Sequence, residues 1–113
     1  MKLSFIGAAH EVTGSCHLLE VNGKNILIDA GPDLREQINK NNINDIDAVF
    51  LTHGHYDHIA SMPELSRASW LLGHKINIYA SNETLSEVKK SFAYLFNDDE
   101  PEAKGLIWHE IPQ

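Results

Sequence analysis

The residues His53-Gly54-His55-Tyr56-Asp57-His58 follow directly on the apolar run Ala48-Val49-Phe50-Leu51. An apolar run of this length between polar segments is typical of a buried strand. Four side chains that can bind a metal ion therefore come together where a strand is expected to end and a loop to begin. This junction predicts both the fold of the chain and the place of its site.

The spacing within this stretch divides its ligands into two pairs. In an extended backbone, residues two apart point the same way, so His53 and His55 can bind one ion. Gly54 between them lets the backbone bend tightly. Asp57 and His58 come where a helix is expected to begin, and they can bind a second ion. Imidazole and carboxylate suit zinc, and also manganese or iron. The alternative is a chance cluster of surface histidines.

A second apolar run, Ile26-Leu27-Ile28, ends in Asp29-Ala30-Gly31. Together with the histidine stretch, it resembles the Asp-x-Gly and HxHxDH motifs of the metallo-β-lactamase superfamily. Residues 31–37 and 78–81 are similar to the hydrolases around the phosphonate-pathway cyclic phosphodiesterase. Residues 5–16 look more like the RNA-cleaving β-CASP branch. The resemblance covers nearly the whole chain.

The resemblance implies an α/β fold in which residues 1–113 are a single partial domain, the N-terminal half of an αββα sandwich. It implies a mostly antiparallel sheet with helices on one face. Superfamily domains are about twice as long as these 113 residues, since sandwich-type domains run to roughly 200–250 residues. The open face of half a sandwich also favours self-association.

The resemblance assigns a role to each ligand. His53 and His55 would bind the first of two zinc ions, and Asp57 and His58 would bind the second. Asp57 would also be the catalytic residue, because it could accept a hydrogen bond from the metal-activated hydroxide. Asp29 would be a buried carboxylate that orients a ligand histidine. The alternative for Asp29 is a capping role at the end of a strand.

Three ligands of the superfamily site have no counterpart in this sequence: a third histidine, a bridging aspartate and a last histidine. The later histidines His74 and His109, and the earlier His17, lack metal-binding spacing. His10 and Glu11 lie in a loop that either borders the site or is only surface. We therefore expect half of a site, which a C-terminal half or an associated chain would complete.

Composition limits the classes of function. The chain has 16 acidic and 9 basic residues and a formal charge of −7, which disfavours broad electrostatic capture of nucleic acid. A small phosphoester is compatible with this charge, because bound metal ions supply local positive charge. Cys16 is the only cysteine, and no apolar run reaches the ~18 residues of a membrane span. We expect a cytoplasmic protein without membrane contact.

Local patterns predict the elements around the two motifs. Asn22-Gly23 between two apolar runs predicts a β-hairpin. Helices are expected over about 32–41, about 63–72 with Gly73 as the stop, and from Ser81 or Asn82 to about 95. Further strands are expected over residues 3–7, 75–80 and 106–111.

The sequence thus predicts a metal-dependent hydrolase that cleaves a phosphodiester with a metal-activated hydroxide. Among enzymes, hydrolysis of a thioester or of a lactam is the alternative. Outside the enzymes, the alternative is a non-catalytic half-domain that keeps the fold and part of the metal binding. Residues 1–113 alone are expected to be inactive or incomplete.

Overall fold

The computed structural model describes residues 2–5, 17–30, 34, 45–52, 59–96, 99–100, 102 and 104–112, and for residues 2–5 only the backbone. The motif at 53–58 and the N-terminal loop with His10 and Glu11 lie outside these ranges. So does the helix expected over 32–41, apart from Leu34, which is buried.

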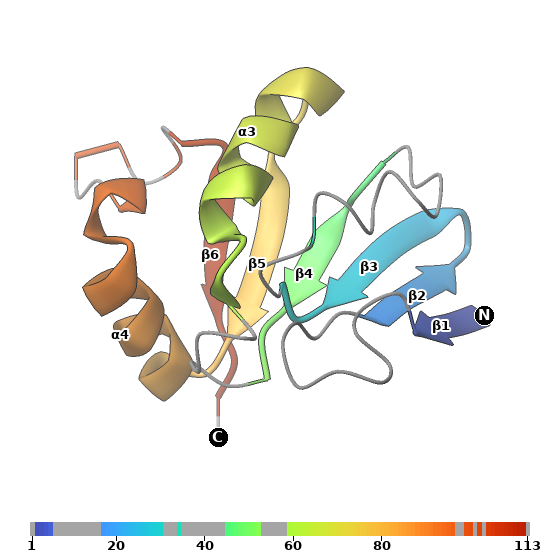
Figure 1. Cartoon of the computed structure of the whole chain (residues 1–113), viewed down its shortest axis with the longest axis horizontal. Helices are drawn as coiled ribbons and strands as arrows, with labels where there is room; N and C mark the ends of the chain where they lie inside the picture. The colour runs from blue at the N-terminus through green and yellow to red at the C-terminus, as the bar shows by residue number, and fades with distance from the viewer. Residues whose placement is uncertain are drawn as a thin grey trace.

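Within the described residues, six strands form one sheet, and their order in the sheet is their order in the chain. Figure 1 shows this sheet with its first strand at one side and its last strand at the other. The strands are β1 (Lys2–Phe5), β2 (His17–Val21), β3 (Lys24–Ile28), β4 (Ala48–Phe50), β5 (Ile76–Ala80) and β6 (Leu106–Glu110).

The hairpin predicted at Asn22-Gly23 is confirmed. β2 and β3 pair antiparallel, and Val21 lies opposite Lys24 across a two-residue turn. Asn22 has φ 49° and Gly23 has φ 78°, the left-handed values that a type I′ turn requires at both central positions. The turn therefore fixes the register in which β3 delivers its last residues.

The directions of the later strands correct the expectation of a mostly antiparallel sheet. β1–β2 and β2–β3 are antiparallel, whereas β3–β4, β4–β5 and β5–β6 are parallel. The reason lies in the connections. A two-residue turn joins only β2 to β3, and the three later connections span residues 29–47, 51–75 and 81–105. Connections of a dozen residues or more, with helices in them, join parallel strands.

The described helices begin and end largely as predicted. α3 (Met62–Leu72) stops at Gly73, which has φ 77°. α4 (Asn82–Ser91) is capped by Ser81, whose Oγ accepts a hydrogen bond from the backbone N–H of Thr84. α4 is shorter than expected, because the chain leaves the helix at Phe92 and closes with the 3-10 helix η1 (Ala93–Leu95). Among the described residues, no helix has both the length and the apolar character that a membrane crossing requires.

Both described helices pack on one face of the sheet, as expected. Leu27, Val49 and Ile78 are register neighbours on this face and are fully buried. They belong to one core with side chains from α3 and α4, including Leu65 and Val88. The α/β class, with helices on one face of a sheet, is therefore confirmed.

The opposite face of the sheet carries a row of stacked rings. Phe50, Tyr79 and His109 are neighbours across β4, β5 and β6. The ring centroids of Phe50 and Tyr79 are 4.9 Å apart, and those of Tyr79 and His109 are 4.5 Å apart. His109 Nε2 also lies 2.8 Å from Asn77 Oδ1. All four side chains are half-buried.

Gly105 is the point at which β6 comes closest to α3. It has φ 78°, and a Cβ placed on it would lie 1.8 Å from Ser69 Oγ. Ser69 is itself buried in α3, where its hydroxyl donates to the carbonyl of Ser66. The Gly105 carbonyl accepts a hydrogen bond from the N–H of Ile76 and so ties β6 to β5.

We therefore predict that Gly105→Ala lowers the free energy of unfolding by roughly 2–4 kcal/mol, from left-handed strain and overpacking together. Gly73→Ala is the matched control, because φ is 77° there and no atom lies within 4 Å of the added Cβ. It should cost only about 1 kcal/mol. Urea unfolding of the two variants measures the difference. Equal losses would mean that Ser69 moves aside without cost.

Candidate metal centre

The four parallel strands bring their carboxyl ends to the same edge of the sheet, where the arrowheads of β3, β4, β5 and β6 lie in Figure 1. Backbone hydrogen bonds continue for one residue beyond the strands. The N–H of Asp29 donates to the Phe50 carbonyl (2.7 Å), and the N–H of Leu51 donates to the Tyr79 carbonyl (2.9 Å). The residues that leave β3 and β4 are therefore held side by side at this carboxyl edge.

Asp29 connects these two strand ends through its side chain. Its residue surface is only 3% exposed, and its backbone has φ 69°. The Thr52 backbone N–H donates to Asp29 Oδ1 (2.8 Å), and Thr52 Oγ1 lies 2.8 Å from Oδ2 and 3.0 Å from Oδ1. A buried carboxylate is costly unless such donors surround it. The structure thus holds Thr52, the residue directly before His53, in a fixed place.

The segment that follows the motif is anchored to the same place. The N–H of Ser61 donates to the carbonyl of Ala30 (3.0 Å). Ile59 and Ser61 are both buried, as is Met62 at the start of α3. The two described segments that flank the motif, 45–52 and 59–96, are therefore tied to the adjacent residues Asp29 and Ala30.

His53, His55, Asp57 and His58 themselves lie outside the described residues. In the ranges that the structure does describe, no three His, Cys, Asp or Glu side chains are placed to hold an ion. The predicted ligand set stays a prediction, while the contacts of the flanking residues Thr52 and Ser61 are structural facts.

Thr52 and Ser61 were not predicted as parts of this centre. Nothing in the local pattern links either residue to Asp29 or Ala30, because the contacts join segments far apart in sequence; Thr52 and Asp29 are 23 residues apart. One signal was available for Thr52. A hydroxyl residue between a buried strand and the first ligand histidine is suited to hold a buried carboxylate.

The described histidines outside the motif have other contacts. His74 lies at the opposite end of the sheet, where Nδ1 is 2.9 Å from the Lys75 carbonyl and Nε2 is 2.6 Å from Asp45 Oδ1. The carbonyl of Lys75 and the carboxylate of Asp45 favour the imidazolium form and raise the pKa of His74. The hydrogen bond from His74 lowers the pKa of Asp45. His109 bonds to Asn77, as described above.

Comparison with known proteins gives a consistent pattern. The model of the beta-lactamase superfamily domain matches residues 24–113. A ribonuclease of Thermus thermophilus is 36% identical over 91 residues, which are 75% of this chain and 20% of the ribonuclease.

Two solved structures have the same fold over nearly all of this chain. A diphosphatase from the PhnP family has a TM-score of 0.81 and 25% identity, over 97% of this chain and 50% of its own. Zn²⁺-bound PqqB from Methylobacterium extorquens has a TM-score of 0.74 and 21% identity, over 99% of this chain and 50% of its own. The chain therefore spans about half the length of the solved structures that it resembles.

We predict that Thr52→Val lowers the free energy of unfolding by about 1–2 kcal/mol, because it removes one donor from the buried Asp29 carboxylate while keeping the shape of the side chain. Thr52→Ser keeps the hydroxyl and is the matched control, with an expected loss well below that of the valine variant. Denaturant unfolding at neutral pH compares the two. If the serine variant loses as much stability as the valine variant, the hydroxyl does not support Asp29.

Proposed function

Because the chain belongs to the metallo-β-lactamase superfamily, we propose that it carries the first half of the metal site of a phosphodiester hydrolase. Two of the proteins that it resembles are named a ribonuclease and a diphosphatase. Both names denote the cleavage of bonds to phosphorus. This common chemistry favours a phosphoester over a thioester or a lactam as the substrate.

The contact between Asp29 and Thr52 is the observation that carries the proposal. It fixes Thr52, the residue directly before the motif, at the carboxyl edge of four parallel strands. In open α/β sheets, ligands bind beyond the carboxyl ends of the strands. With Thr52 held at this edge and Ser61 bonded to Ala30, the histidines between them in the sequence would be suited to bind ions there.

The donor set of the motif fits zinc-type ions. In the proposal, His53 and His55 bind one ion, and Asp57 and His58 bind a second. Zinc is favoured because PqqB, which shares this fold, is Zn²⁺-bound; manganese and iron suit the same donors. A bound ion polarises a substrate oxygen and lowers the pKa of bound water. Asp57 would accept a hydrogen bond from the attacking water and so orient its lone pair toward the substrate.

The substrate class that we propose is a small phosphoester. The formal charge of −7 opposes a long polyanion, since tight binding of nucleic acid needs many lysine and arginine contacts to phosphate. RNA is the second candidate, favoured by the match to the Thermus thermophilus ribonuclease. A short single-stranded RNA and bis-p-nitrophenyl phosphate, assayed side by side, distinguish the two classes.

A non-catalytic half-domain is the alternative outside the enzymes. The chain spans 50% of the diphosphatase that it resembles, and the ring-bearing face of the sheet has none of the described helices on it. We propose that the rest of a complete domain covers this face and supplies the missing histidines and aspartate. Self-association through the same face is the other way to cover it.

Our prediction for metal binding concerns His55→Ala. This variant should raise the zinc dissociation constant of the first site by about tenfold to a hundredfold, because water replaces a directional imidazole bond poorly. His74→Ala is the matched control, since that imidazole lies at the opposite end of the sheet and bonds to Asp45. Competition with a chromophoric chelator gives the affinity, and mass spectrometry gives the stoichiometry. Unchanged binding in the His55 variant would exclude it as a ligand.

Our prediction for activity follows from the number of ligands. A catalytic zinc normally keeps about three protein ligands, and each half-site here would have only two from the motif. A nucleophile misplaced by ~1 Å costs about a hundredfold in rate. The 113-residue chain alone should therefore hydrolyse bis-p-nitrophenyl phosphate barely, if at all, with zinc or with manganese.

Adding a C-terminal half that supplies the missing ligands should produce metal-dependent turnover, and His53→Ala should abolish it. Robust turnover by the isolated chain, lost in the His53 variant, would contradict the ligand count. The site would then be completed between copies of the chain or by His10 or His109.

A further inference from the structure

The parallel strands begin at the end of the sheet opposite the carboxyl edge, and we call this end the amino edge. Residues 45–47, which lead into β4, are bonded there to both neighbouring strands. On the side of β3, the N–H of Asn25 donates to Asp47 Oδ2 (2.8 Å), and Asn25 Nδ2 donates to the Asp45 carbonyl (2.9 Å). On the side of β5, the N–H of Asn77 donates to the Asp47 carbonyl (3.3 Å).

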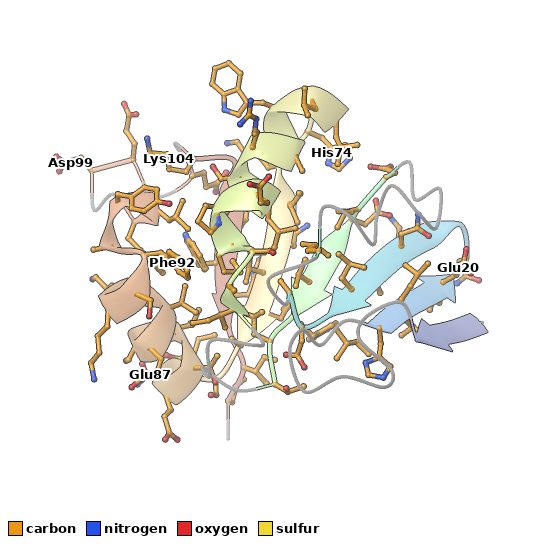
Figure 2. The ribbon with its side chains drawn as sticks, in the orientation of Figure 1. Glu20, His74, Glu87, Phe92, Asp99 and Lys104 are labelled. Carbon is orange, nitrogen blue, oxygen red and sulfur yellow. The ribbon has the colours of Figure 1, made fainter. Side chains whose placement is uncertain are left out.

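His74 adds a side-chain contact to this edge. It lies in the short turn between Gly73, where α3 stops, and the start of β5, and Figure 2 shows it at this end of the molecule. Its Nε2 is 2.6 Å from Asp45 Oδ1, and its Nδ1 is 2.9 Å from the carbonyl oxygen of Lys75. The imidazole therefore joins the turn before β5 to the segment before β4.

Both ring nitrogens of His74 face acceptors. A backbone carbonyl and an ionised carboxylate can only accept hydrogen bonds, so each contact needs an N–H on the ring. The neutral imidazole has one N–H, and its other nitrogen would direct a lone pair at an oxygen. The imidazolium has two and satisfies both contacts. The geometry at His74 therefore fits the protonated ring.

The acidic groups around the ring act in the same direction. The hydrogen bond to the Lys75 carbonyl contributes most to raising the pKa of His74, followed by the hydrogen bond to Asp45. The charges of Asp45 and Asp47 add to this effect. In return, the hydrogen bond from His74 is the main cause that lowers the pKa of Asp45.

The described lysines nearby do not oppose this arrangement. Lys24 at the start of β3 acts on Asp45, where its charge further lowers the pKa of the carboxyl group after the larger effects of His74 and the Ile46 N–H. Lys75 is paired with a carboxylate of its own, since its Nζ lies 2.7 Å from Glu102 Oε1. The carboxylate of Asp45 thus remains the charged partner of the ring.

We propose that the contact between His74 and Asp45 is a pH-sensitive switch at the amino edge. When the ring is protonated, the contact joins the turn before β5 to the segment before β4. When the ring loses a proton, one of its two hydrogen bonds is lost and the two segments open more readily. The switch lies at the opposite end of the sheet from Asp29 and Thr52. It is therefore independent of the proposed hydrolase activity, and either proposal can fail alone.

The two pKa changes set the pH range of the switch. Because the pKa of His74 is raised, the contact contributes fully below the ordinary histidine value of 6.5 and is lost as the pH rises through the raised pKa. Because the pKa of Asp45 is lowered, the contact is present above the ordinary value of 3.8 and is lost as the pH falls through the lowered pKa. The switch is closed between these two values.

A double-mutant cycle of His74→Gln and Asp45→Asn tests the contact. The two side chains are 39% and 52% exposed, so at pH 6 we expect a coupling of about twofold to fivefold in the unfolding equilibrium constant, the range of exposed ion pairs. At pH 9 the coupling should fall close to one. Urea unfolding of the four chains measures it. The same coupling at both pH values would overturn the switch.

NMR titration of the imidazole signals tests which carboxylate acts on the ring, with His74→Gln identifying the His74 signal. Asp45→Asn should lower the pKa of His74, because the amide keeps an acceptor oxygen but carries no charge. Asp47→Asn is the matched control, since the Asp47 carboxylate accepts from the N–H of Asn25. It should lower the pKa of His74 less. Equal effects of the two substitutions would overturn the assignment to Asp45.

Amide hydrogen exchange tests whether the two segments open. The N–H of Asn77 joins them through the Asp47 carbonyl, and its protection should fall by about twofold to fivefold between pH 6 and pH 9. In His74→Gln, its protection should not change with pH. The N–H of Leu51 is the internal control, because it bonds to the Tyr79 carbonyl at the carboxyl edge. An equal fall at both amides would overturn a switch confined to the amino edge.

Discussion

The buried carboxylate of Asp29 is the constraint on which the functional edge depends. It sits at the end of β3 at 3% exposure, and Thr52 at the end of β4 supplies both a backbone and a hydroxyl contact to it. A shift of β4 by one residue would remove these donors and leave a charge buried without them, which is far costlier than losing an exposed pair. The pairing of β3 with β4 is therefore fixed by chemistry as well as by apolar packing.

Local chemistry made much of the fold predictable. Asn22-Gly23 specifies the hairpin because few residues tolerate positive φ, and Gly73 ends α3 for the same reason. The direction of the later strands was missed although the sequence contained the signal. Helical patterns between Ile28 and Ala48, and between Phe50 and Ile76, require crossovers, and crossovers join parallel strands.

The candidate site was predictable only where it is contiguous in sequence. The spacing of the histidines and the strand end at Asp29 are local signals. The attachments through Thr52 and Ser61 depend on contacts between distant segments, which no short pattern encodes. The same holds for Trp70 and Leu71. Both residue types are usually buried, and only the packed orientation of α3 places these two side chains in solvent.

The parallel pairing of strands β3 to β6 also affects the kinetics of folding. The β2–β3 hairpin closes a loop of two residues. The contact between Asp29 and Thr52 joins residues that are 23 apart in the sequence and therefore closes a much longer loop. Closing long loops costs entropy before any contact forms, so we expect the hairpin to form early and the carboxyl edge to form late. Interactions that arise after the folding transition state slow unfolding more than they speed folding. An ion held at this edge would therefore mainly slow the unfolding of the chain. It would lengthen the lifetime of the folded state and leave the rate of folding nearly unchanged.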